Sequence, residues 1–278
     1  MTDLHFYLGT HQPHWLELTD VPLFVSHRRL AGRKTLPRAR GDVAVDSGGF
    51  SELTMFREWR TTPQEYVTAV RRYDEEIGHI GWAAPMDWMC EPHMLAKTGL
   101  TVAEHQRRTV ENFVQLRDLW ADGDDCPDVA REPEFCVFMP VLQGWTGDDY
   151  LRCAEMYERA GVTLSHHPVV GLGSVCRRQA TGEIGAIVRR VKRELDVDLH
   201  GFGVKTAGLA AYAADLSTAD SMAWSFDARR LQKPLPECAG LGHKNCANCL
   251  TFALAWRERV LAAADRPEQL LLDEGWAA

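Results

Sequence analysis

The stretch Val43-Ala44-Val45-Asp46-Ser47-Gly48-Gly49-Phe50 runs from a short apolar segment into a carboxylate, a hydroxyl and two adjacent glycines. The apolar residues predict a buried strand that ends at Asp46. Because glycine has no side chain, a ligand can approach the backbone after this acid closely. A tight turn would use the same residues, so the interpretation depends on how the other strands of the chain end.

Short apolar runs alternate with longer segments of helical periodicity along most of the chain. The predicted strands are His5–Gly9, Pro22–Ser26, Val43–Asp46, Ile80–Pro85, Cys136–Gln143, Val169–Gly173, Leu199–Val204 and Thr218–Trp224. The predicted helices between them are Pro63–Ile77, Thr101–Trp120, Asp148–Ala160, Glu183–Leu195 and Thr206–Ala214. This alternation predicts an α/β fold with a parallel sheet and helical crossovers. Eight strands in about 225 residues fit a (β/α)8 TIM barrel better than an open doubly wound sheet, although the first connection has no obvious helix.

The sequence changes character after Trp224, which predicts a second and smaller unit. A basic stretch with Arg229 and Arg230 leads into a proline-containing segment, a cluster of cysteines and an amphipathic helix over Thr251–Ala264. We therefore expect a catalytic barrel in residues 1–225. Residues 226–278 are expected to form a zinc-binding segment and a C-terminal helix that pack on the barrel.

The cysteine cluster has the spacing Cys238-x4-His243-x2-Cys246-x2-Cys249. Three thiols and one imidazole are a ligand set of tetrahedral zinc, and Cys-x-x-Cys binds one ion with two thiolates from a tight turn. Four protein ligands leave no open position, so the spacing predicts a structural Zn²⁺ site. The same residues also fit a set of reduced cysteines or a redox-active Cys-x-x-Cys.

Composition and charge limit the classes of protein to which the chain can belong. Its 278 residues are 45% hydrophobic and 25% charged, with a net charge of −8, which argues against a nucleic-acid coat but not against a local basic site. Such a site is predicted in residues 28–40, where Arg28 and Arg29 begin a run of six basic residues without an acid, although a solvated loop has the same composition. There is no apolar run of about 20 residues and no secretory leader, so we expect a cytoplasmic protein with no membrane partner.

Polar side chains follow several of the predicted strands where each strand ends. They are Asp46 with Ser47, Asp87, Gln143 with Gly144, Gly173, and Asp220 with Ser221. In a TIM barrel the carboxyl ends of the strands meet at one mouth, where catalytic groups lie. Any one of these acids can instead cap the next helix. A packed core does not need three carboxylates and a carboxamide in one place, so the set predicts an active site.

The same residues resemble the tRNA-guanine transglycosylases. Asp46-Ser47-Gly48-Gly49-Phe50, Val141-Leu142-Gln143-Gly144, Val170-Gly171-Leu172-Gly173 and the final cysteine cluster occur in the order seen in that family, over His5 to Ala264. The short chain and the divergent last strand look more like the branch that places deazapurines in DNA, the DNA-guanine transglycosylases. The resemblance implies exchange of guanine in nucleic acid for a 7-deazaguanine such as 7-cyano-7-deazaguanine.

The resemblance also implies roles for individual residues. Asp220 would attack C1′ to give a covalent glycosyl-enzyme, and Asp46 would be the general acid and base, as two carboxylates are in retaining glycosidases. Ser47 would help to orient the ring. The substrate-binding set would be Ser47, Gly48, Gly49, Asp87, Gln143, Gly144 and Gly173, with Met86, Trp88 or Met222 as stacking faces. Phosphate contacts would come from Arg28, Arg29, Arg229 and Arg230.

Several alternatives stay open at this point. The last strand has Asp220 but alanine at position 223, where the tRNA enzymes carry a second aspartate, so Asp227 is an alternative nucleophile and an inactive, nucleic-acid-positioning subunit is an alternative function. A metal-dependent hydrolase would instead use His11, His14, His200 and Asp220. DNA is favoured over tRNA by the family branch alone. A homodimer or helper proteins are both compatible with the sequence.

Overall fold

The fold is built on eight parallel strands. The computed structural model describes residues 4–122, 136–176, 178, 182–204 and 206–265. The strands are β1 His5–Thr10, β2 Leu23–Ser26, β3 Val43–Asp46, β4 Ile80–Ala83, β5 Val141–Leu142, β6 Val170–Leu172, β7 Leu199–Gly201 and β8 Thr218–Ser221. They pair in the order β4-β3-β2-β1-β8-β7-β6-β5. The predicted α/β fold with a parallel sheet is therefore confirmed, and each predicted strand overlaps an observed one, with β1 extending one residue beyond its predicted end to Thr10.

The sheet curls until its two edge strands approach each other. Ala83 at the end of β4 forms a parallel bridge with Phe138, and the Ala83 N–H donates to the Val137 carbonyl at 2.8 Å. The strand predicted over Cys136–Gln143 is shorter than expected, since β5 begins only after Pro140. Proline has no N–H to donate to a ladder, which explains the interruption. The edges are thus joined by a short bridge, without a long ladder in the described residues.

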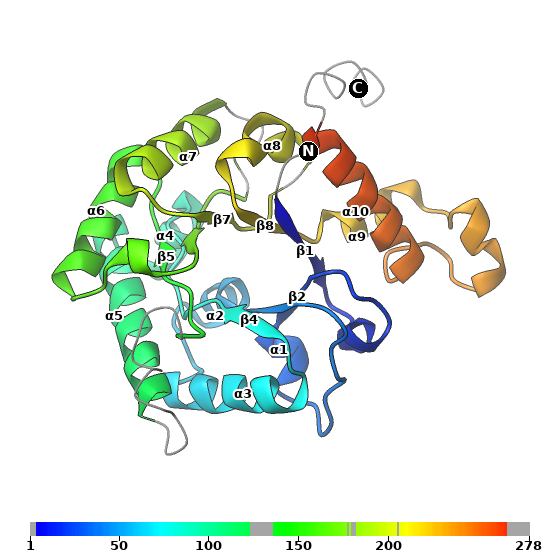
Figure 1. Cartoon of the computed structure of the whole chain (residues 1–278), viewed down its shortest axis with the longest axis horizontal. Coiled ribbons are helices and arrows are strands. Elements are labelled where there is room, and N and C mark those ends of the chain that lie inside the picture. Colours follow the sequence, from blue (N-terminus) through cyan, green and yellow to red (C-terminus); the bar gives the residue numbers. More distant parts are fainter. Residues whose placement is uncertain (1–3, 123–135, 177, 179–181, 205, 266–278) are drawn as a thin grey trace.

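The helices are α1 His27–Leu30, α2 Gly49–Phe56, α3 Pro63–Glu76, α4 Pro92–Thr98, α5 Val102–Ala121, α6 Gly147–Arg159, α7 Gly182–Leu195, α8 Thr206–Tyr212, α9 Ala223–Leu231 and α10 Leu250–Asp265. The longest of them surround the sheet on its outer side, whereas α2 and α4 pack on each other (Figure 1). Thr62 and Thr146 begin α3 and α6 with capping boxes, which satisfy amide groups of the first turn. The first connection, which lacks a helical pattern, contains the 3-10 helix η1 Pro13–Glu17.

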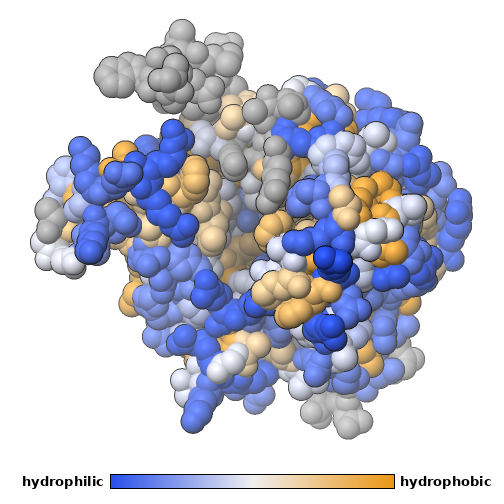
Figure 2. All heavy atoms as spheres, turned by 180° about the vertical axis from the view of Figure 1, so that it is seen from behind, coloured by the Kyte–Doolittle hydropathy of each residue, from blue (hydrophilic) through white to orange (hydrophobic). Residues whose placement is uncertain are grey.

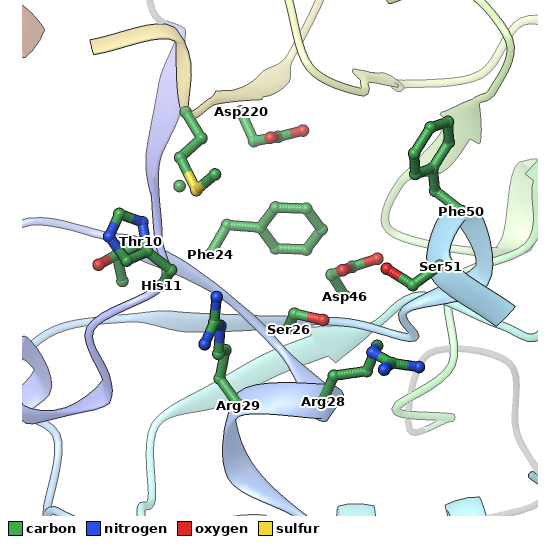
Figure 3. Close-up of a pocket in the computed structure, with 12 residues that line it drawn as sticks. Thr10, His11, Phe24, Ser26, Arg28, Arg29, Asp46, Phe50, Ser51 and Asp220 are labelled. Carbon is green, nitrogen blue, oxygen red and sulfur yellow. The ribbon is translucent and has the colours of Figure 1, made fainter. Parts of the chain in front are cut away.

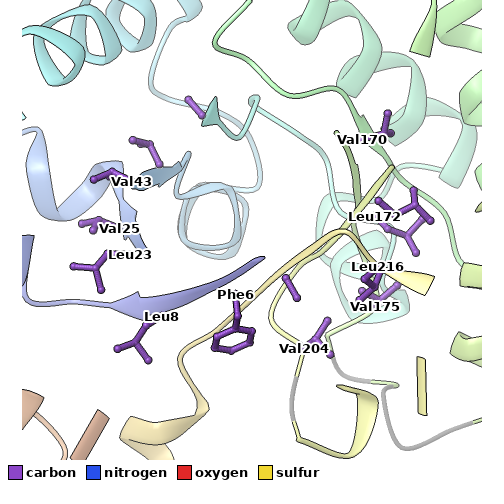
Figure 4. Close-up of a cluster of buried hydrophobic side chains, with 14 of the residues drawn as sticks. Phe6, Leu8, Leu23, Val25, Val43, Val170, Leu172, Val175, Val204 and Leu216 are labelled. Carbon is purple, nitrogen blue, oxygen red and sulfur yellow. The ribbon is translucent and has the colours of Figure 1, made fainter. Parts of the chain in front are cut away.

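Side chains alternate along the strands and form two apolar layers. Phe6, Leu8 and Val43 belong to the main cluster between the sheet and the helices (Figure 4). Tyr7 and Ala44, one residue away in the same strands, belong to a second cluster on the inner face. The next inward-facing positions, at the carboxyl ends of the strands, are therefore where polar groups can lie without disturbing the main core.

The C-terminal segment packs against the amino-terminal strand. After α9 comes the 3-10 helix η6 Pro236–Leu241, which extends away from the sheet, and then α10 returns to contact α8, α9 and β1 (Figure 1). Arg257 in α10 donates to the Phe6 carbonyl at 3.3 Å. Among the described helices, none combines the length and apolar character needed to cross a membrane.

Candidate active site and metal centre

A cavity of about 530 Å³ lies at the carboxyl ends of β1, β2, β3 and β8 (Figure 3). Asp46 and Asp220, the two predicted catalytic acids, both line it. The complete lining is Gly9, Thr10, His11, Phe24, Ser26, Arg28, Arg29, Asp46, Phe50, Ser51, Asp220 and Met222. Figure 3 shows the two carboxylates directed into the same space, with Phe24 on one side. Strands far apart in the sequence thus bring two acids to one cavity.

Asp46 is held at the end of β3 by the turn that follows it. Its Oδ1 accepts the Gly48 N–H at 3.1 Å, and Gly48 adopts a φ of 83°, which favours glycine. Burial raises the pKa of Asp46, and the negative charge of Asp220 acts in the same direction. Hydrogen bonds from the Gly48 amide and the Ser26 hydroxyl oppose this rise. A carboxyl group with a raised pKa retains a proton that it can donate.

Asp220 lies in a different environment, although it lines the same cavity. It is 5% exposed, and its Oδ1 accepts the Gly203 N–H at 2.8 Å. Nε2 of His200, a buried histidine in β7, lies 3.4 Å from the same oxygen. Oδ1 of Asp220 is thus turned toward two nitrogens, the Gly203 amide and the imidazole Nε2 of His200.

Asp87 and Gln143 form a second polar group, which does not line this cavity. The Gln143 amide nitrogen donates to Oδ2 of Asp87, and its amide oxygen accepts the Ser174 hydroxyl at 2.7 Å. Burial raises the pKa of Asp87 to about 7, with further increases from Asp46 and Glu91. Neither Ser174 nor Glu91 is predicted from the sequence, because nothing local marks a contact between residues 83 positions apart.

The glycines at the strand ends make room for these polar groups. A Cβ at Gly173 would lie 2.2 Å from the Gln143 amide nitrogen, and one at Gly49 would lie 3.2 Å from Oδ1 of Asp87. A Cβ at Gly144 would meet Asp149 at 2.8 Å. Gly173 and Gly49 therefore permit side-chain packing around Asp87 and Gln143, whereas Gly144 permits packing against α6. Ser47 is buried beside Asp46 at 2% exposure.

The predicted basic residues separate into two groups. Arg28 and Arg29, in α1, line the cavity, and Arg28 lies 3.5 Å from the Glu52 carboxylate. Arg229 and Arg230 are exposed on α9 and do not belong to the cavity lining. Arg229 donates to the Ser225 hydroxyl at 3.1 Å. The structure therefore brings the first pair, but not the second, next to Asp46 and Asp220.

Apolar groups at the cavity were not all expected. Of the three predicted stacking residues, Met222 lines the cavity, while Met86 and Trp88 are buried elsewhere at 1% and 5% exposure. Phe24 and Phe50 were missed, although Phe24 precedes Ser26 by two residues and so shares its face of β2. Phe50 is 47% exposed. Figure 2 shows a mainly hydrophilic face with apolar side chains gathered in a few places.

The predicted zinc ligands come together. Ligand atoms of Cys238, His243, Cys246 and Cys249 all lie within 4.8 Å of one another. The Cys238 and Cys249 sulfurs are 3.7 Å apart, and Nε2 of His243 is 3.4 Å from the Cys246 sulfur. Tetrahedral zinc, with Zn–S of about 2.3 Å and Zn–N of about 2.0 Å, requires separations of about 3.8 and 3.5 Å. The donor set and its spacing therefore fit a metal ion held by four protein ligands.

A comparison with protein families matches residues 2–278 to the model of DpdA, DeoxyPurine in DNA protein A. The chain belongs to the DpdA family. This membership confirms the predicted resemblance to the deazapurine-in-DNA branch and supports a DNA-guanine transglycosylase type of role in deazapurine modification of DNA. A comparison with curated proteins found no match.

Two alternative sites find less support in this DpdA-family chain. Asp227 accepts the Trp256 indole N–H at 2.9 Å and is not part of the cavity lining, unlike Asp220. A hydrolase metal site would require His11, His14, His200 and Asp220 to form one cluster of ligands. In the part of the chain that the structure describes, the Cys238–Cys249 cluster is the single group of three or more potential ligands.

Proposed function

We propose that the chain exchanges guanine in DNA for a 7-deazaguanine such as 7-cyano-7-deazaguanine, through a covalent aspartyl-glycosyl intermediate. The observation that carries this proposal is the presence of Asp46 and Asp220 in one cavity but in different environments. Two carboxylates that differ in this way suit an acid and a nucleophile. We further propose that the eight strands act as a closed (β/α)8 barrel, with the cavity at its carboxyl-end mouth.

In the first step, the Asp220 carboxylate attacks C1′ of the target nucleotide. A C1′–O bond forms while the C1′–N9 bond breaks, and the electron pair of that bond leaves with guanine. Asp46 gives its proton to the departing base, which is released in neutral form. The raised pKa of Asp46, caused by burial and by the charge of Asp220, suits this donation.

In the second step, the incoming 7-deazaguanine takes the place of guanine. Asp46, now a carboxylate, accepts the N9 proton, and N9 attacks C1′ as the ester bond to Asp220 breaks. The Asp220 carboxylate and the Asp46 acid are both restored. Two successive displacements retain the configuration at C1′, as in retaining glycosidases.

Recognition of the base is assigned to Asp87, Gln143 and Gly173. A carboxylate accepts hydrogen bonds from guanine N1–H and the exocyclic amine, and a carboxamide can donate to O6. The Gly173 N–H already donates to the Leu142 carbonyl at 3.0 Å, so Gly173 contributes by leaving room rather than by donating. The Asp87–Gln143 hydrogen bond, next to Gly173, supports a joint role. The target base has to leave the DNA stack to reach them. Ser47, Gly48, Gly49 and Gly144 complete the proposed base pocket.

DNA contacts are assigned first to Arg28 and Arg29 beside the cavity, and then to Arg229 and Arg230 on α9. Contacts with phosphates position a nucleic acid without reading its sequence. Zn²⁺ is assigned to Cys238, His243, Cys246 and Cys249, where four ligands leave no place for a substrate. In this assignment the ion stabilises the fold of the C-terminal segment.

The proposal is tested by offering the full-length protein duplex DNA, single-stranded DNA or tRNA, each carrying labelled guanine, together with 7-cyano-7-deazaguanine. We expect exchange into DNA and a denaturant-stable covalent complex, both lost in Asp220→Ala. Asp46→Ala should slow exchange strongly, and Asp227→Ala should not. Exchange into tRNA alone would contradict the choice of DNA. Exchange that survives Asp220→Ala would contradict the mechanism, and no exchange on any nucleic acid would favour a positioning subunit.

A further inference from the structure

The imidazole of His200 faces Asp220 from the neighbouring strand. His200 is 0% exposed, and its Nε2 lies 3.4 Å from Oδ1 of Asp220. Within the described residues Nε2 has no hydrogen-bond partner, although it is shielded from solvent. Buried polar nitrogens are nearly always hydrogen-bonded, so the position of this one points to a task in the site.

The other ring nitrogen of His200 contacts a hydroxyl that can fix its tautomer. Nδ1 lies 2.7 Å from Oγ1 of Thr218, and the parallel register pairs these two residues. If the hydroxyl donates to Nδ1, the proton of the neutral ring resides on Nε2, which then faces the carboxylate as a donor. In the opposite tautomer, a lone pair on Nε2 would face the negative charge of Asp220. The surroundings therefore favour a proton on Nε2.

Aromatic side chains hold the ring in place. The ring centroids of Trp82 and Phe202 lie 4.7 and 4.6 Å from that of His200. Those of Phe24 and Tyr7 lie 6.3 and 6.4 Å away. These rings leave His200 little freedom to rotate and keep water from Nε2. The imidazole is thus rigidly presented to Asp220.

We propose that Thr218 and His200 position the Asp220 carboxylate for attack. Thr218 donates to Nδ1, the Nε2–H of His200 donates to Oδ1 of Asp220, and the Gly203 N–H donates to the same oxygen. Two donors then hold Oδ1, and Oδ2 is the oxygen that forms the bond to C1′. This role rests on the proposed function, because it requires Asp220 to be the nucleophile. The 3.4 Å contact is expected to shorten in the DNA complex, as catalytic contacts commonly do.

The tautomer can be measured without any reaction. Long-range ¹H–¹⁵N spectra of the full chain labelled with ¹⁵N-histidine report which nitrogen carries the proton, and His200→Gln identifies the His200 signals by their loss. We expect the proton on Nε2 in the wild type and in Thr218→Ser, and a changed tautomer distribution in Thr218→Val. A proton on Nδ1 in the wild type would overturn the proposal, whether or not the chain modifies DNA.

A pair of amide substitutions tests the effect on catalysis. Glutamine places its amide nitrogen near the position of Nε2, whereas asparagine reaches only the position of Nδ1. In His200→Gln we expect exchange at saturating DNA and base to fall by about tenfold at most, and in His200→Asn by about 100-fold. DNA affinity and the unfolding temperature should agree between the two variants. Equal losses in both would overturn the positioning role, while absence of a covalent complex in the wild type would overturn the proposed function instead.

Discussion

Nε2 of His11 lies 2.5 Å from the side-chain oxygen of Asn248, which is 237 positions later in the chain. His11 lines the cavity, and Asn248 lies between the metal-ligand candidates Cys246 and Cys249. The His11 ring also stacks on Trp224, with centroids 5.8 Å apart and planes 9° apart. The cysteine cluster therefore supports one wall of the cavity, and this contact links its integrity to the site.

Removal of the metal should destabilise the fold and disturb the cavity. We expect one Zn²⁺ per chain by elemental analysis, and loss of the ion in Cys246→Ala with a clear decrease in the unfolding temperature, because structural zinc contributes directly to folding. Cys136→Ala is the matched control, since Cys136 lies outside the cluster. A full complement of zinc in Cys246→Ala would contradict the assignment.

Asp87 should make stability depend on pH between about 4 and 7. Burial raises the pKa of Asp87 from 3.8 to about 7, so the folded chain holds a proton in this range that the unfolded chain releases. This contribution to the free energy of unfolding is complete below pH 3.8 and is lost as the pH rises through 7. We expect the free energy of unfolding, measured in urea titrations, to fall less between pH 5 and pH 8 in Asp87→Asn than in the wild type. The difference should be about 1–2 kcal/mol, a value reduced for the partial exposure of the Asp87 side chain. If the free energy of unfolding fell equally with pH in the wild type and in Asp87→Asn, the raised pKa of Asp87 would be refuted.

The same titration should appear in base recognition. Protonated Asp87 loses the acceptor that guanine N1–H requires, so the affinity for the free base should weaken as the pH falls below about 7. Asp87→Asn should bind more weakly at pH 8 and lose this pH dependence. Calorimetric titration with 7-cyano-7-deazaguanine at several pH values is the measurement, and an unchanged profile in the variant would exclude Asp87 from recognition.

Gly173→Ala should disrupt the Asp87–Gln143 group. The added Cβ would lie 2.2 Å from the amide nitrogen of Gln143, which is 0% exposed and cannot move without breaking its hydrogen bonds. We expect a loss of about 1–3 kcal/mol in the free energy of unfolding, together with weaker base binding. Gly182→Ala serves as the control, because a Cβ there meets nothing within 4 Å. If Gly173→Ala were as stable as Gly182→Ala, the end of β6 would be able to accommodate the added Cβ and the prediction would be wrong.

Arg28 and Arg29 should contribute to the salt dependence of DNA binding. Each phosphate contact adds about 0.9 to the slope of log K against log salt, so the double substitution to alanine should reduce the slope by about 2 for every sequence tested. Arg33→Ala removes a charge from the same basic segment but not from the cavity lining, and should change the slope less. A slope unaffected by the double substitution would exclude this pair. Arg229→Ala and Arg230→Ala measure how much α9 contributes to the salt dependence of DNA binding.

The strands and the metal ligands could be predicted because their signals are local. Asp46 and Asp220 meet because both occupy inward positions at strand ends, which follows from alternation and parallel order. Ser174 and Glu91 could not be predicted in the same way, because their contacts join distant loops. The interruption before β5 depends on a single residue, Pro140, within an otherwise apolar run, and the run as a whole predicts one longer strand.

The aromatic packing around His200 also determines how the cavity can be used. Trp82, Phe202 and Tyr7 fill the inner face beneath Phe24, which itself lines the cavity. These side chains close the cavity on the side of the inner core, so a base that enters at the strand ends cannot pass through the interior of the sheet. The proposed covalent mechanism requires guanine to leave before its replacement attacks C1′, so it predicts ping-pong kinetics, with free guanine competing against the incoming deazapurine for the covalent enzyme form.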